Sequence, residues 1–170
     1  MSKEHLAANC GLYCGACSLY RARRDNNPQF IDEMMQVIRN DLPVPDEKIN
    51  MDEIDCDGCR AGGLLTSYCM GCKIRLCVEK KSDFGHCTEC KDFPCSLIAD
   101  FNNDGMPHHA EAVKNMIDMR LIGIKNWIHE QEKRWQCHAC STAIHWYSGT
   151  CPKCETLQPN RLLKLSKDSR

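Results

Sequence analysis

A cysteine pattern that occurs twice between residues 69 and 95 constrains this chain more than any other feature. The pattern is C-x2-C-Lys-x3-C, and its two copies contain Cys69, Cys72 and Cys77, then Cys87, Cys90 and Cys95. A C-x2-C pair lets two sulfurs converge on one ion while backbone amides of the turn point at them, as in zinc and iron–sulfur sites. The repeat therefore predicts that this segment binds metal.

Composition indicates that metal supplies part of the folding free energy. The chain has 170 residues, and its 42% hydrophobic content includes 15 cysteines. The other apolar residues make a thin core for this length, with only 3 Trp, 4 Tyr and 4 Phe. A structural zinc site contributes roughly 10–16 kcal/mol, which is comparable to the whole stability of a domain.

The sequence favours metal ligands over disulfide bonds. Its first residues contain no apolar signal segment, and no later stretch approaches the ~18 apolar residues of a membrane span. We therefore expect a cytoplasmic protein with no membrane partner. A reducing compartment keeps thiols available for metal.

A separate cysteine group lies near the N-terminus, where Cys10, Cys14 and Cys17 have C-x3-C-x2-C spacing. Radical S-adenosylmethionine enzymes hold a [4Fe–4S] cluster with this spacing, but on a partial α/β barrel. Here the motif begins at residue 10 and no βα repeats follow it, which argues against that class. The group remains a candidate zinc site, iron–sulfur site or open catalytic metal site.

Apolar spacing and helix-start signals predict four helical segments. The first spans residues 16–24, and the second starts at Asn27 and Pro28, an N-cap and a first-turn proline, and ends before Pro43. A short helix is expected at 96–101. The longest is expected at 108–134, where apolar residues keep helical spacing past Gly123. These residues are Val113, Met116, Ile117, Leu121, Ile124, Trp127 and Ile128.

The C-terminal cysteines predict a zinc ribbon. Cys137, Cys140, Cys151 and Cys154 form C-x2-C-x10-C-x2-C. Between the pairs, residues 143–147 are β-prone and 148–149 suggest a turn, so we expect a hairpin whose two knuckles hold one ion through four thiolates.

These segments together indicate a small, metal-stabilised α+β fold that is mainly helical. We expect a cysteine-rich metal-binding domain with knuckles and short hairpins at 1–105 and a long packing and connector helix at 106–134. The zinc ribbon follows at 135–157, and a flexible tail at 158–170.

Tetrahedral sites take four ligands each, so the eleven cysteines before the ribbon must be divided. The most local division groups Cys56, Cys59, Cys69 and Cys72, and separately Cys77, Cys87, Cys90 and Cys95. The three N-terminal cysteines would then need a fourth ligand, for which His5, His86, a water or another cysteine are candidates. Crossed divisions stay open, because spacing alone does not fix connectivity. With the ribbon, we expect three or four zinc ions, with [4Fe–4S] as the alternative in the body.

Charge is distributed unevenly along the chain. Residues 133–170 carry a net charge of +5 and residues 1–132 carry −6. If Trp135, Trp146 and Tyr147 are exposed among these cations, the ribbon could bind single-stranded nucleic acid by charge and stacking. A protein partner is the first expectation and nucleic acid the second.

Several motifs in order make the chain resemble a known family. CGLYCGAC, CDGC, CxxCxIRxC and CxxCxxFPC, over about residues 8–101, resemble the cysteine-rich domain of unknown function 3795 family of bacteria and archaea. The resemblance implies metal binding and no assigned reaction.

Three hypotheses about function follow. The first is a zinc-stabilised adaptor that binds a protein or nucleic acid through its ribbon. The second is an iron–sulfur protein in electron transfer or cluster handling. The third is a metalloenzyme with an open site at Cys10, Cys14 and Cys17, although no catalytic constellation favours enzyme activity.

Overall fold

The computed structural model describes residues 3–41, 55–81 and 83–162. Within these ranges the chain is mainly helical, as predicted, and its β-structure consists of isolated bridges rather than strands. The α-helices are α1 (Ser18–Arg24), α2 (Gln29–Asp41), α3 (Ser67–Met70), α4 (Lys73–Lys80), α5 (Ser96–Asn102), α6 (Ala112–Ile122) and α7 (Ile124–Arg134). Short 3-10 helices are η1 (Glu4–Leu6), η2 (Cys14–Ala16), η5 (Cys87–Glu89) and η6 (His109–Glu111).

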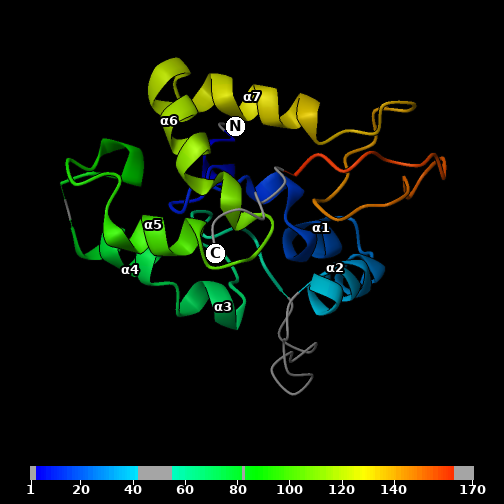
Figure 1. The fold of residues 1–170 in the computed structure, drawn as a ribbon, viewed down its shortest axis with the longest axis horizontal. Coiled ribbons are helices and arrows are strands. Elements are labelled where there is room, and N and C mark those ends of the chain that lie inside the picture. The colour runs from blue at the N-terminus through cyan, green and yellow to red at the C-terminus, as the bar shows by residue number, and fades with distance from the viewer. Residues whose placement is uncertain (1–2, 42–54, 82, 163–170) are drawn as a thin grey trace.

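The helices surround the N-terminal segment, which runs through the middle of the molecule (Figure 1). α6 and α7 cover one side of it, α4 and α5 lie at one end, and α1 and α2 lie at the other. The C-terminal cysteine segment extends beside α1 and α2. The N-terminal segment, which carries Cys10, Cys14 and Cys17, is therefore central in the molecule.

One apolar core joins the N-terminal segment to α6 and α7. Trp127 and Met116 are fully buried, and the Tyr13 ring meets Trp127 edge-on with 6.1 Å between ring centroids. Gly11 permits this packing because it has φ +86° and a Cβ there would lie 2.5 Å from the Ala112 carbonyl oxygen. Only glycine accepts both that conformation and that approach.

The second predicted helix is present as α2. Asn27 Oδ1 accepts a hydrogen bond from the Gln29 amide at 3.2 Å, which is the expected cap. Its predicted apolar face is buried, including Phe30 and Ile31 at 2% and 1% exposure. The predicted helix end near Pro43 lies outside the described residues, as does most of the acidic linker that follows.

The prediction of one long helix over 108–134 is wrong. Gly123 has φ 82° and ψ 150°, which ends α6 and starts α7 in a new direction (Figure 1). Glycine alone enters that region readily, so a residue that looked tolerable inside a helix separates two. The apolar stripe is interrupted as well, because Ile117 and Leu121 are 45% and 77% exposed.

Across the described ranges, no helix is both long and apolar enough to cross a membrane.

Candidate metal centres

The four ribbon cysteines converge on one point. Their sulfurs all lie within 4.8 Å of one another, with 3.6 Å between Cys137 and Cys154 and 3.6 Å between Cys140 and Cys151. A tetrahedral ion with Zn–S bonds of about 2.3 Å needs sulfurs ~3.8 Å apart. The donor set and its spacing therefore fit a single zinc-sized ion.

The two knuckles of this site have the same backbone construction. In the first, Cys137 N–H donates to the Thr142 carbonyl at 2.8 Å, and Ser141 N–H donates back to the Cys137 carbonyl at 2.9 Å. In the second, the pairs are Cys151 with Thr156 at 2.9 Å and Glu155 with Cys151 at 3.0 Å. Ser141 and Glu155 both have positive φ, which turns the chain so that each second cysteine faces the ion.

The hairpin predicted between the knuckles is not seen. Ala143 forms a bridge with Gln136 inside its own knuckle, and Thr150 forms one with Leu157. Trp146 and Tyr147, expected in a strand, lie in a turn. The ribbon therefore consists of two knuckles that are not paired in a hairpin. The loop between them packs on the N-terminal half of the chain.

That loop is attached to the N-terminal half of the chain. Trp146 N–H donates to the Ala16 carbonyl at 2.9 Å. The His145 ring lies between the Ser18 hydroxyl at 2.9 Å from Nδ1 and the Glu33 carboxylate at 2.9 Å from Nε2. The Phe30 ring packs on the same imidazole, with centroids 4.7 Å apart.

The expectation that Trp135, Trp146 and Tyr147 are exposed is wrong. Their exposed fractions are 3%, 8% and 8%, because all three belong to the main apolar core. Trp146 stacks on His108 with 4.4 Å between ring centroids. These rings therefore cannot serve as a stacking surface for unpaired bases.

Ser18, His145 and Glu33 have the composition of a hydrolytic triad but not its access. Ser18 is 0% exposed and His145 is 1% exposed. A nucleophile must reach its substrate, and this hydroxyl reaches only the imidazole. The three residues instead link α1, α2 and the ribbon loop.

The N-terminal cysteines lie close to Cys56, Cys59, Cys69 and Cys72. The Cys14 and Cys59 thiols influence each other's pKa, and so do the Cys56 and Cys69 thiols. Seven cysteines interact in this way or electrostatically: Cys10, Cys14, Cys17, Cys56, Cys59, Cys69 and Cys72. These interactions connect the N-terminal three with Cys56, Cys59, Cys69 and Cys72, as a crossed division of the ligands would.

The cysteines of this seven-thiol group differ widely in pKa. Burial raises the pKa of Cys17 to about 11, whereas the hydrogen bond from Cys69 lowers the pKa of Cys56 to about 6. Several buried thiolates repel one another unless a cation lies between them. Metal binding deprotonates such thiols and removes the repulsion, so the group suits cations.

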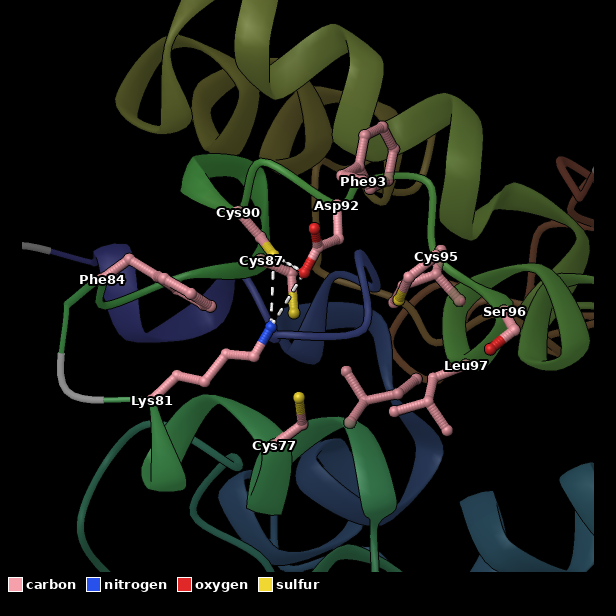
Figure 2. A pocket seen from close by; sticks show the side chains of 12 residues that line it. Cys77, Lys81, Phe84, Cys87, Cys90, Asp92, Phe93, Cys95, Ser96 and Leu97 are labelled. Atoms are coloured by element: carbon pink, nitrogen blue, oxygen red, sulfur yellow. Dashed lines mark hydrogen bonds and ion pairs between the residues drawn. The ribbon is translucent and has the colours of Figure 1, made fainter.

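The four remaining body cysteines gather around a cavity. Cys77, Cys87, Cys90 and Cys95 all line it, as the local division of ligands predicted for this group (Figure 2). Burial, then the neighbouring Cys95 and Cys77, raises the pKa of Cys87 to about 12. His86 is not available as a ligand, because its Nδ1 contacts Thr88 and its Nε2 contacts the Ala8 carbonyl, each at 2.9 Å.

Arginines hold the backbone at the cysteine pairs, a role that spacing did not reveal. Arg75 donates to the carbonyls of Cys69 and Met70 at 2.9 and 2.7 Å. Arg120 donates to those of Thr88 and Cys90, both at 2.7 Å. Arg75 belongs to the quoted CxxCxIRxC motif, whereas Arg120 comes from α6 and carries no local signal.

A third arginine that holds the backbone is Arg60, which directly follows Cys59 in the sequence. Its guanidinium donates to the carbonyls of Glu4 and Ala7, both at 2.9 Å. Arg60 thereby connects the N-terminal segment to the segment that carries Cys56 and Cys59.

These features define a cysteine-rich protein with a helical body and a C-terminal four-cysteine metal-type site. The chain belongs to the family described as protein of unknown function (DUF3795), whose model matches residues 6–100. The match ends before α6, so α6, α7 and the ribbon lie outside it. No curated protein and no solved structure matches the chain.

Proposed function

We propose that this protein is a multi-site metal-binding adaptor in which zinc at the ribbon fastens the C-terminal segment to the body. The observation that carries the proposal is the convergence of Cys137, Cys140, Cys151 and Cys154 within 4.8 Å. The ribbon loop is anchored on α1 and α2, so an ion that orders the knuckles also orders the loop between them.

Ligand arithmetic allows three or four metal centres. The ribbon and the four-cysteine cavity account for one each. Two tetrahedral ions need eight ligand positions, so the seven-thiol group holds two only if one thiolate bridges them. The same division would give the N-terminal cysteines protein ligands from Cys56 and Cys59, and it would leave no open coordination position at Cys10, Cys14 and Cys17.

A protein partner fits the surface better than nucleic acid does. The ribbon's aromatic rings are buried, and two cations that flank the ribbon make internal contacts: Arg134 pairs with Glu111, and Arg161 donates to the Gln136 carbonyl at 3.0 Å. Leu157, in the second knuckle, is 76% exposed. Lys164, Lys167 and Arg170 lie outside the described residues.

A second candidate function is an iron–sulfur protein in electron transfer or cluster handling. The observation that favours it is the cavity between Cys77, Cys87, Cys90 and Cys95. A single ion draws its four sulfurs together, whereas these sulfurs surround a space.

Metal analysis of the full chain, purified anaerobically, tests the proposal. We expect zinc in the wild-type protein and about one equivalent less in Cys140→Ser. His138→Ala should retain it, since His138 is exposed within the first knuckle. Equal zinc in wild type and Cys140→Ser would reject the ribbon as a zinc site.

A further inference from the structure

We infer that the cavity lined by Cys77, Cys87, Cys90 and Cys95 is a [4Fe–4S] cluster site. The inference deepens the second candidate function and gives it a place in the fold. It does not depend on which ion the ribbon holds.

The four cysteines reach the cavity from three different elements. Cys77 comes from the last turn of α4, Cys87 and Cys90 come from η5 and its end, and Cys95 caps the start of α5. Figure 2 shows their sulfurs pointing toward a common space. That space has a volume of about 190 Å³.

The sulfur spacing separates this site from the ribbon. In the part of the chain that the structure describes, one group of three or more candidate ligand atoms lies within 4.8 Å of one another, and it is the ribbon group. The sulfurs around the cavity are therefore more widely spaced than those of the ribbon. A single zinc holds all its thiolates in mutual contact. In a [4Fe–4S] cluster each thiolate binds a different iron, and the inorganic core fills the space between them. Four thiols around a cavity match the second arrangement. The sulfurs of the seven-thiol group are also more widely spaced than those of the ribbon, so the cavity, and not the spacing alone, carries the assignment.

The rest of the lining is suited to a cluster. Phe84, Phe93 and Leu97 line the cavity together with Ile74 and Ile98. An apolar surrounding limits the access of water and sets the reduction potential of a cluster. Apolar side chains thus cover part of the cavity, while the charged Lys81 and Asp92 line its more exposed part.

One cation points at the cluster ligands. Lys81 Nζ lies 4.0 Å from Cys90 Sγ and 3.1 Å from Asp92 Oδ2 (Figure 2). Four thiolates give a [4Fe–4S] site a net negative charge, which increases on reduction. A nearby ammonium that donates to a ligand sulfur favours the reduced state and raises the reduction potential.

Contacts outside the cavity hold the loop that carries Cys87 and Cys90. Arg120 of α6 donates to the carbonyls of Thr88 and Cys90, and its guanidinium lies 4.4 Å from the Phe93 ring centroid. On the other side His86 bonds the Ala8 carbonyl. Both contacts leave the cysteine sulfurs free to face the cavity.

The test is anaerobic reconstitution of the full chain with ferrous iron and sulfide, followed by iron and acid-labile sulfide analysis. Wild type should contain about four more irons and four more sulfides than Cys77→Ser/Cys95→Ser, and Cys140→Ser should match wild type. Circular dichroism checks that each variant is folded. Cys90→Ser alone provides a second readout, since loss of one thiolate should change the EPR spectrum of the reduced cluster. Equal sulfide in wild type and the double variant, or an unchanged spectrum in Cys90→Ser, would overturn the inference.

Lys81→Gln tests the local environment without touching a ligand. It should retain iron and sulfide but lower the reduction potential, whereas Lys80→Gln, on the exposed neighbouring residue, should not. Zinc is measured in the same samples. A chain that keeps ribbon zinc but binds no sulfide rejects the cluster alone, and a chain that binds sulfide but no ribbon zinc rejects only the ribbon proposal.

Discussion

His145 in the ribbon loop lies 2.9 Å from the carboxylate of Glu33 in α2, across 112 positions of sequence. The imidazole is fully buried, and its other nitrogen contacts Ser18. This contact joins the C-terminal cysteine segment to the helices that follow the N-terminal cysteines. The ribbon is therefore part of the packed molecule.

Replacing Glu33 with Gln should weaken this attachment. The Glu33 side chain is 38% exposed, so solvent screens the interaction, and we expect a loss of about 1 kcal/mol in the free energy of unfolding. Asp32→Asn is the matched control, because it removes one charge from the neighbouring exposed position. Urea unfolding of both variants measures the difference. Equal stability of the two would show that the contact contributes nothing.

Loss of the ribbon ion should loosen residues 135–162. Cys140→Ser should increase hydrogen exchange of the Cys137, Ser141 and Trp146 amides, because the knuckles and the loop between them are ordered together. His138→Ala should leave the exchange unchanged. Protection of the Trp146 amide in Cys140→Ser at the wild-type level would mean that the loop packs independently of the ion.

Gly11 should tolerate no side chain. Gly11→Ala places a Cβ 2.5 Å from the Ala112 carbonyl oxygen at a φ of +86°. We therefore expect the free energy of unfolding to fall by about 1–3 kcal/mol from backbone strain, and further from the close contact. Gly149→Ala has nothing within 4 Å of the new Cβ and serves as the control. Thermal unfolding of the two variants compares them. A Gly11→Ala protein as stable as the control would contradict the packing of α6 on the N-terminal segment.

His108 should make the fold sensitive to acid. Burial against Trp146 and Tyr147 holds its pKa well below the usual value, so the folded state keeps it neutral. Its contribution is complete above about pH 6.5 and falls by about 1.4 kcal/mol per pH unit below that, since only the unfolded chain takes up the proton. In His108→Asn the drop in stability between pH 7 and 5.5 should be smaller by about 1.4 kcal/mol, because one pH unit of this range lies below pH 6.5. An equal drop in both proteins would remove His108 as the cause.

Features encoded locally could be predicted from the sequence. The ribbon cysteines were predicted as one site because C-x2-C pairs fix their own geometry, and the structure brings them together. α2 was predicted because Asn27 and Pro28 start it and an apolar face buries it. Cys77, Cys87, Cys90 and Cys95, which the local division placed together, line one cavity because the chain between them is short.

Features that depend on contacts between distant parts of the chain could not be predicted from the sequence. The crossing of Cys14 with Cys59 brings together segments 45 residues apart, and no spacing rule specifies it. Gly123 was compatible with the helical stripe, and its φ of 82° is decided by how α6 and α7 pack. Exposure of Trp146 was expected from neighbouring charges, but it is buried through contacts with Ala16 and His108, which lie far away in the sequence.

The central claim is that the fifteen cysteines are reduced ligands that hold metal. All fifteen are free thiols in this structure. Native mass spectrometry of the full chain, prepared without oxygen or chelator, tests the claim most directly. We predict a mass above that of the chain by bound zinc and by a [4Fe–4S] cluster, and a return to the reduced chain mass after acid denaturation. A native mass without metal, lower than the chain by two hydrogens for each disulfide, would contradict the account.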